Sequence, residues 1–288
     1  MKSIAIVADI HANHFALEAV MEAIDQLNVD EVIVAGDMVG RGPQGSEVVD
    51  TIDRLGWRAL RGNHEDYLLN FCAGDIPDPW HHEEQWAASR WMAHELSQPA
   101  LTYLEALPFS LTSNIDSSIE VYHGSPNSHR EGIGPWTSAG RMDAYLRQID
   151  GSLLLCAHTH RPLHHSTDRG AIINVGSVGL PFNGDWRAQF VTLTGRPGRW
   201  EPTFHRVEYD RAAFLEHYRT SGFLDQGRIT AQLLYREVEH ARPFLVPFLT
   251  WCEKAGRPPR KASMKDFLEI YDPQCSMREF FEGLDDLS

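Results

Sequence analysis

Cysteine is scarce and scattered in this chain. The four cysteines include no C-x-x-C pair and are spread along the sequence, at Cys72, Cys156, Cys252 and Cys275. This usage argues against a disulfide framework and against a zinc knuckle. It fits a reducing compartment, and we therefore expect a cytoplasmic protein.

Positive charge is also in short supply. The 26 basic residues face 40 acidic residues, which gives a formal net charge of −14. Such a balance argues against broad electrostatic capture of nucleic acid or of an anionic membrane. We expect no stable nucleic-acid binding and no membrane partner, and part of the negative charge is available to hold cations.

Long apolar runs are missing from the N-terminus. The stretch MKSIAIVADIH is interrupted by Asp9 and His11 before a signal peptide or a membrane span would be complete. We interpret it as a first β-strand. The sequence contains no repeats and no low-complexity segment, and its 288 residues suffice for one large core or a core with an appendage.

Apolar periodicity predicts the order of the elements. The first third alternates between short β-branched runs and helical segments, which predicts parallel strands. Residues 66–107 indicate inserted helices, and several later strand signals without helices between them predict a mixed sheet. From about residue 209 the pattern is helical, with Asp210, Ser263 and Ser276 as candidate helix caps.

Metal-ligand residue types cluster where apolar runs end. Five stretches share this feature: ADIH (Asp9, His11), AGDMV (Asp37), RGNHED (Asn63, His64), VYHGS (His123) and CAHTH (His158, His160). Residues two apart in a strand point the same way, so each D-x-H or H-x-H pair is expected to present two ligands to one side. A single such pair is usually a solvated loop, but five together predict a shared metal site.

The donor types favour particular metals. Carboxylates, imidazoles and one amide, without a thiolate, suit Mn²⁺ best, with Fe or Zn²⁺ as alternatives, and disfavour a Ca²⁺ cage. Seven ligands are too many for one ion and suffice for two divalent ions if one carboxylate bridges them.

The ordered set D-x-H, G-D, G-N-H-E, H-G and H-x-H, between Lys2 and Val207, resembles the calcineurin-like metallophosphoesterase superfamily. The stretches GDMVGRGP and LRGNHED look like serine/threonine phosphatases and diadenosine tetraphosphatases, and YHGSP and INVGSVGLP look like bacterial phosphodiesterases. The resemblance implies an α/β fold with α+β character, in which two mixed β-sheets pack as a sandwich flanked by helices, in four αββα layers. Together with the helical pattern after residue 209, it predicts a metallophosphoesterase domain at residues 1–208, with a helical insertion at about 66–107, and a helical C-terminal extension at 209–288.

Carried over residue by residue, the resemblance also implies roles. One metal would be held by Asp9, His11 and His160, the other by Asn63, His123 and His158, and Asp37 would bridge them. His64 would be the catalytic acid, and Arg41 would bind the substrate phosphate.

Two positions depart from the family pattern. Protein phosphatases carry Asp one position before the arginine, where it orients the catalytic histidine, but this chain has Gly40. The residue that orients His64 is therefore unassigned. Ala157 replaces a usual glycine, and we expect it to crowd a turn without loss of metal.

The segment GRGPQG also fits the G-x-G-x-x-G pattern of dinucleotide-binding loops. That pattern should follow the first strand and precede an acidic residue by about twenty positions. Here it follows the second predicted strand, contains Pro43, and comes after Asp37. We therefore interpret it as the loop that brings Asp37 to metal and Arg41 to phosphate.

The implied activity is hydrolysis of a phosphate mono- or diester by a metal-bridging hydroxide, with a small nucleotide-type or phosphoprotein substrate. The competing hypothesis is a non-catalytic metal-binding interaction module that kept the fold. Such a relic would be expected to lose ligands or His64, and this chain has them all. The oligomeric state is left open.

Overall fold

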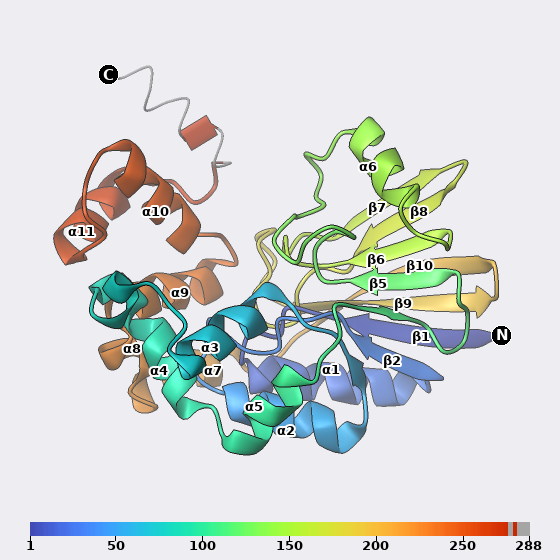
Figure 1. The fold of residues 1–288 in the computed structure, drawn as a ribbon, viewed down its shortest axis with the longest axis horizontal. Coiled ribbons are helices and arrows are strands. Elements are labelled where there is room, and N and C mark those ends of the chain that lie inside the picture. Colours follow the sequence, from blue (N-terminus) through green and yellow to red (C-terminus); the bar gives the residue numbers. More distant parts are fainter. Residues whose placement is uncertain (276–278, 281–288) are drawn as a thin grey trace.

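Two five-stranded sheets lie side by side in one half of the molecule, on the right in Figure 1. The computed structural model describes residues 1–275, 279 and 280. In the first sheet the strand order is β10-β9-β1-β2-β3. The strands are β1 (Lys2–Val7), β2 (Glu31–Val34), β3 (Arg58–Ala59), β9 (Ala188–Arg196) and β10 (Arg199–Val207). As predicted for the first third, β1, β2 and β3 pair in parallel, while β9 and β10 join in antiparallel fashion.

The second sheet has the strand order β4-β5-β6-β8-β7. Its strands are β4 (Ser110–Thr112), β5 (Ile119–Tyr122), β6 (Leu153–Cys156), β7 (Leu163–Thr167) and β8 (Gly170–Asn174). The pairs β5·β6 and β6·β8 are parallel, and the two edge pairs are antiparallel. The predicted mixed sheet is confirmed, although the short strands β4 and β7 had not been expected.

The side chains of β1 alternate between the two faces of the first sheet, and this alternation explains how the sheets pack. Ile4 and Ile6 belong to the core between the two sheets, together with Val121 and Leu155 of the second sheet. The neighbouring Ala5 and Val7 belong to the core under the helices. Because both faces are covered, β1 reads as an unbroken apolar run. The predicted sandwich flanked by helices is thereby confirmed.

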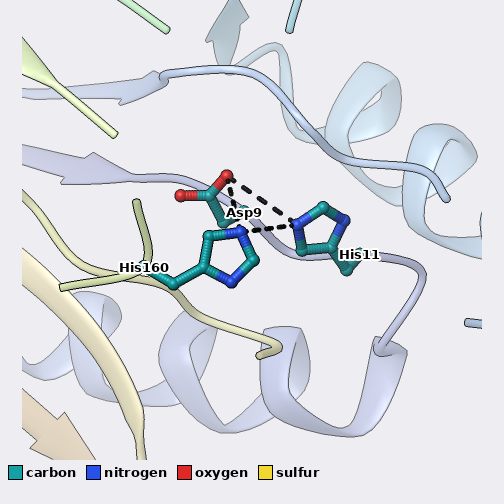
Figure 2. Close-up of side chains that lie close together, drawn as sticks. All are labelled: Asp9, His11 and His160. Carbon is teal, nitrogen blue, oxygen red and sulfur yellow. Dashed lines mark hydrogen bonds and ion pairs between the residues drawn. The ribbon is translucent and has the colours of Figure 1, made fainter. Parts of the chain in front are cut away.

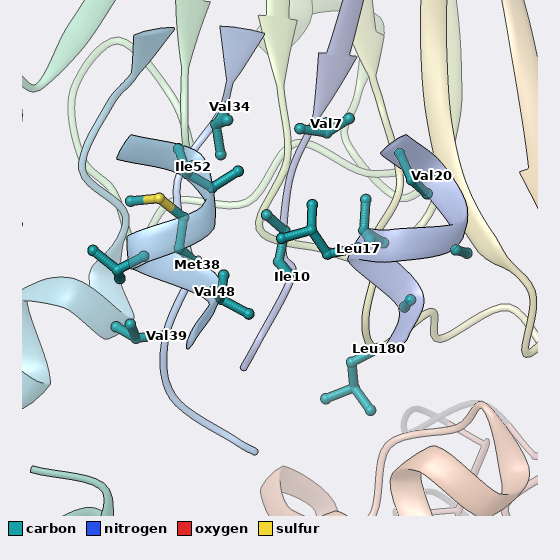
Figure 3. Close-up of a cluster of buried hydrophobic side chains, with 14 of the residues drawn as sticks. Val7, Ile10, Leu17, Val20, Val34, Met38, Val39, Val48, Ile52 and Leu180 are labelled. Carbon is teal, nitrogen blue, oxygen red and sulfur yellow. The ribbon is translucent and has the colours of Figure 1, made fainter. Parts of the chain in front are cut away.

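Helices α1 (His14–Leu27) and α2 (Gly45–Leu55) cover the outer face of the first sheet (Figures 1 and 3). In α1 the buried residues Leu17, Val20 and Ile24 recur at helical spacing. Asn13 is the N-cap of this helix, since its side chain accepts a hydrogen bond from the Ala16 amide at 3.0 Å.

The remaining helices lie between and after the strands. The segment from β3 to β4 contains α3 (Asn63–Ala73), η1 (Asp78–His81), η2 (Glu84–Trp86), α4 (Ala87–Glu95) and α5 (Gln98–Glu105), as the sequence predicts. Helix α6 (Ala139–Leu146) packs on the second sheet. The C-terminal helices are α7 (Arg211–Thr220), α8 (Phe223–Gln226), α9 (Arg228–His240), α10 (Leu245–Lys254) and α11 (Lys261–Ile270).

The C-terminal helices divide between two cores. Phe214, Tyr218 and Phe223 join the same core as α1 and α2. Helices α10 and α11 build a smaller core with α9, which includes Phe248 and Phe267. One apolar core therefore crosses the predicted boundary at residue 208. The division of the chain there stays a prediction.

The helix caps agree only in part with expectation. Asp210 caps α7 by accepting a hydrogen bond from the Ala213 amide at 2.9 Å, as predicted. The prediction for Ser263 was wrong: it lies inside α11, where its hydroxyl donates to the Pro258 carbonyl at 2.8 Å. Ser276 lies outside the described residues. None of the described helices combines the length and apolar character needed to cross a bilayer.

Candidate metal centre

The predicted ligands come from loops that follow strands. Asp9 and His11 follow β1, Asp37 follows β2, and Asn63 begins α3 just after β3. His123 follows β5, and His158 and His160 follow β6. Since the parallel strands of each sheet end at one edge, these loops meet there, where open α/β sheets generally bind ligands. The structure brings all seven predicted ligands together.

Left-handed backbone conformations aim these side chains. Ten described non-glycine residues have positive φ, and six of them are site residues: Asp9, His11, Asp37, Arg41, His158 and His160. Such conformations cost about 1–3 kcal/mol each and persist where the surroundings enforce them. The expectation that extended strands present each pair was therefore wrong. Turns beyond the strand ends turn both members inward.

Asp9, His11 and His160 form the first ligand group (Figure 2). The Nε2 atoms of His11 and His160 lie 3.0 Å apart, and Asp9 Oδ1 lies 3.8 and 3.5 Å from them. The Nδ1 atoms of the two rings face the carbonyls of Val39 and Leu180, at 3.3 and 2.5 Å. If both Nδ1 atoms donate to these carbonyls, two Nε2 lone pairs face each other beside Asp9 Oδ1, a buried atom with no hydrogen-bond partner. This arrangement fits a cation.

Asp37, His123, His158 and Asn63 form the second group. Asp37 Oδ2 lies 3.2 Å from His123 Nε2, while His123 Nδ1 faces the Ala35 carbonyl at 2.9 Å. Asn63 Oδ1 lies 3.1 Å from His123 Nε2 and 2.7 Å from His158 Nδ1. Asp37 Oδ2 is also 3.8 Å from His11 Nε2 of the first group. Asp37 therefore lies between the two groups.

Burial and mutual charge perturb these ligands strongly. Burial raises the pKa of Asp9 well above its usual value and lowers the pKa values of His11 and His160. Burial opposes charge on His123 as well, but the Asp37 and Asp9 carboxylates and the Ala35 carbonyl together outweigh it and raise the pKa of His123 to about 10. Protons and a divalent cation would compete for the same atoms, so metal binding is expected to release protons.

Glu65 supports the Asp37 loop, a role that the sequence motif did not reveal. Its two carboxylate oxygens accept hydrogen bonds from the amides of Asp37, Met38, Val39 and Gly62, at 2.7–3.2 Å. Burial, followed by the charge of Asp37, raises the pKa of Glu65 to about 7. Gly62 is required here, since a Cβ would lie 2.2 Å from Asp37 Oδ1.

Arg41 and His64 lie together beside the ligands. The Nε–H of Arg41 donates to His64 Nε2 at 3.1 Å. Burial lowers the pKa of His64 to about 3, so this ring is neutral near pH 7 in the arrangement seen. Donor atoms of His64, His11 and Asp37 also lie within 4.8 Å of one another, so the geometry permits His64 as a ligand too.

The Gly40 position explains why no aspartate orients His64 from there. A Cβ on Gly40 would lie 2.4 Å from His64 Nδ1, so the ring occupies the space that a side chain would need. Arg41 contacts the ring instead. Ala157, the other departure, is fully buried and is absent from the residues with positive φ, so its methyl group introduces no backbone strain.

Arg41 is itself held by the C-terminal helices. Its Nη1 donates to Glu237 Oε2 of α9 at 2.8 Å, and its carbonyl accepts a hydrogen bond from the Tyr218 hydroxyl of α7 at 2.5 Å. The fully buried Glu237 also accepts hydrogen bonds from the amides of Phe244 and Leu245, at 2.8 and 2.9 Å. Sequence analysis missed Glu237. The available signal was a glutamate on the apolar face of a helix, beside Leu234 and Val238.

Residues 2–162 match the family model of the calcineurin-like phosphoesterases. An uncharacterised protein of Methanocaldococcus jannaschii is 27% identical over 222 residues, which cover 72% of this chain and 88% of that protein. A symmetrical bis(5'-nucleosyl)-tetraphosphatase of Nitrosococcus oceani is 29% identical over 126 residues, which cover 43% of this chain and 41% of the relative.

Solved structures agree with this assignment. The crystal structure of a metallophosphoesterase from Sphaerobacter thermophilus has a TM-score of 0.64 and 30% identity, covering 83% of this chain and 99% of that one. A hypothetical protein from Pyrococcus horikoshii, with a TM-score of 0.71, 23% identity and coverage of 85% and 100%, shares the fold. The chain therefore belongs to the calcineurin-like phosphoesterase family, a metal-dependent family, and is a phosphoester hydrolase.

Proposed function

We propose that this protein hydrolyses a phosphate mono- or diester with two divalent cations. The observation that carries the proposal is the place of Asp37, whose carboxylate lies within reach of His11 in one ligand group and of His123 in the other. Asp9, His11 and His160 would hold one cation, and Asn63, His123 and His158 the other. Asp37 would contribute to both.

The donor set supports Mn²⁺ first, with Fe or Zn²⁺ as alternatives, since it combines carboxylate, imidazole and amide groups without a thiolate. When bound, such cations lower the pKa of water and neutralise phosphoryl oxygens. Burial of the ligand side chains limits access of bulk water and strengthens each electrostatic contact.

Arg41 and His64 would act on the substrate itself. Arg41 has donors left beyond those that contact His64 and Glu237, and it would bind the phosphoryl oxygens through them. When Arg41 turns its Nε–H toward a phosphoryl oxygen, His64 Nε2 is freed. His64 would then take up a proton beside the anionic substrate and donate it to the leaving oxygen.

The substrate class follows from charge and similarity. The net charge of −14 disfavours a nucleic-acid polymer and leaves a small nucleotide-type ester or a phosphoprotein. Similarity to the tetraphosphatase supports the nucleotide-type substrate, although it covers 41% of that relative.

Activity and metal content test the proposal. The purified chain should hydrolyse at least one substrate of a panel in the presence of Mn²⁺ and lose this activity with a chelator. The panel comprises p-nitrophenyl phosphate, bis-p-nitrophenyl phosphate, dinucleoside polyphosphates and a phosphopeptide. A wild-type protein that binds metal and hydrolyses none of them would contradict the proposal.

Asp37→Asn tests the shared ligand. Elemental analysis should show most of the metal lost, because one charge that offsets two dications is removed. The exposed Asp168 provides the matched control, and Asp168→Asn should keep both metals. Two metals per chain in a folded Asp37→Asn protein would refute the bridge.

A further inference from the structure

Two arginines near the first ligand group form no ion pair with a carboxylate among the described residues. Arg161 and Arg242 are both half-buried, and no described acidic side chain forms an ion pair with either. By contrast, Arg41, Arg58 and Arg141 each pair with a glutamate. In a chain with 40 acidic and 26 basic residues, carboxylates are not in short supply. Arg90 and Arg236, which are also half-buried, likewise form no ion pair within the described part of the chain, so what distinguishes Arg161 and Arg242 is their position beside the metal ligands.

The pair is connected to the metal centre by one loop. Arg161 directly follows the predicted ligand His160. Phe182 stacks on the His160 ring with centroids 4.5 Å apart, and the Arg41 guanidinium lies 5.9 Å from the same Phe182 ring. Two residues later, Gly184 lies against Arg242, since a Cβ at Gly184 would be 2.5 Å from Arg242 Nη2.

The positive charge of Arg242 acts on Arg161. Burial, followed by the positive charge of Arg242, lowers the pKa of Arg161. Within the described part of the chain, the buried Nε atom of Arg242 has no hydrogen-bond partner, and its Nη2 makes only a long contact, 3.4 Å, with Gln274 Oε1. Buried N–H donors without acceptors are costly, and an anion with several oxygens would satisfy them.

An exposed aromatic ring borders this pair. Trp136 is 62% exposed, and the Arg161 guanidinium lies 5.4 Å from the centroid of its ring. The ring offers a flat apolar surface beside two cationic groups. The base of a nucleotide can stack on such a surface, and neighbouring arginines can bind the phosphates of the same nucleotide.

We propose that Arg161 and Arg242 bind a second phosphate group of a substrate whose first phosphate lies at the metal ligands, and that Trp136 stacks on the attached base. The ligand class is thus a nucleoside polyphosphate. The proposal rests on the proposed function for the position of the reacting phosphate, whereas binding of the anion needs no catalysis.

Binding to the full-length protein, treated with a chelator, tests the arginines without activity. Isothermal titration calorimetry would compare inorganic tripolyphosphate with orthophosphate. Arg161→Gln and Arg242→Gln should each weaken tripolyphosphate binding by about tenfold or more, since each removes a charge-assisted contact. Arg147→Gln, at an exposed arginine beyond α6, should bind as wild type does. Equal tripolyphosphate affinities in wild type and in both variants would overturn the proposal.

Trp136→Leu tests the base. It should weaken binding of adenosine triphosphate by about fivefold or more while tripolyphosphate binding stays unchanged, because only the first ligand has a ring to stack. Unchanged binding of both ligands would show that Trp136 makes no base contact.

The hydrolysis assays separate this proposal from the proposed function. If the wild type hydrolyses no phosphoester and tripolyphosphate binding still depends on both arginines, the anion site stands and the proposed function fails. If the wild type is active, both variants should lose kcat/KM about tenfold for a nucleoside polyphosphate and retain it for p-nitrophenyl phosphate. An equal kcat/KM loss for the two substrates, or no loss, would refute the second phosphate site.

Discussion

A single hydrogen bond, from Arg41 Nε to His64 Nε2 at 3.1 Å, joins the two residues that would act on the substrate. The bond leaves His64 without a proton on Nε2. Burial reinforces this by lowering the pKa of His64 to about 3. A phosphate that draws Arg41 away would free Nε2 and place a negative charge near the ring, and both changes favour protonation, so binding and protonation would be coupled.

His64→Ala distinguishes a proton donor from a ligand. As a donor, His64 can be removed without loss of metal, and kcat should fall by about 10²–10⁴ for an alkyl ester. A nitrophenyl ester should lose much less, because its leaving group needs little protonation. Metal analysis and kcat on both ester types provide the measurement.

Arg41→Ala serves as the comparison, since loss of oxygen contacts should weaken all phosphate substrates alike. An equal penalty for good and poor leaving groups in His64→Ala would show that His64 is not the acid. Loss of one metal in that variant would instead make it a ligand, which its distance from His11 and Asp37 permits.

At the scale of elements, helix α9 reaches the site through one carboxylate. Glu237 is fully buried, and its charge is matched by Arg41 and by two backbone amides. Burial raises the pKa of Glu237, and the Arg41 charge opposes that shift. A helix of the C-terminal region thereby fixes a residue of the Asp37 loop.

Glu237→Gln should destabilise the protein by about 3–5 kcal/mol, the usual cost of leaving one charge of a buried pair uncompensated. Arg41→Met should do the same, and the double variant should be more stable than the sum of the single losses predicts. Denaturant unfolding of the four proteins measures this coupling. Additive losses would show that the pair acts independently.

Asp116 links the ends of the two sheets. It lies between β4 and β5, and its Oδ2 accepts hydrogen bonds from Trp200 Nε1 and the Gly198 amide, both at 2.8 Å. Burial raises the pKa of Asp116, but these hydrogen bonds and that from Ser118 outweigh it and lower the pKa to about 2. The ionised form is therefore favoured by folding.

The pH dependence of the protein's stability follows from the direction of this pKa shift. Because the folded pKa is depressed, the stabilisation is fully present above about pH 4 and is lost as the pH falls through about 2. Asp116→Asn should therefore be about 1–2 kcal/mol less stable than wild type at pH 7, and the difference should shrink below pH 4. Unfolding free energies at several pH values measure it, and a pH-independent difference would contradict this account.

At the scale of the whole molecule, the C-terminal helices belong to the main core. Phe214, Tyr218, Phe223 and Leu234 are almost fully buried there. Burying such side chains contributes about 1.5–3 kcal/mol each, so together they approach the total stability of an ordinary domain. The same helices hold Arg41.

A chain ending at Val207 should therefore be insoluble or unfold far below the full-length protein, although it keeps every predicted metal ligand. Solubility and thermal unfolding of the two chains would measure this. A soluble truncated chain with an unchanged Tm would show that residues 1–208 fold independently.

The sequence by itself determined the family, the seven candidate ligands and most elements, because these depend on local information. Strand runs, helical periodicity and short motifs at strand ends all lie within a few neighbouring residues. Short motifs at strand ends were enough to predict that Asp9, Asp37 and His123 converge, although only the structure showed that His123 comes from the second sheet.

Only the tertiary structure decided how these residues are aimed and held. The left-handed turns at Asp9 and His11 are costly for any non-glycine residue, and surrounding contacts hold them. The pair of Arg41 and Glu237 joins residues 196 positions apart. Likewise, Arg161 and Arg242 are 81 positions apart in the sequence, and only the fold brings the charge of Arg242 to act on Arg161. Charge pairing over such separations depends on three-dimensional proximity, which no local pattern in the sequence encodes.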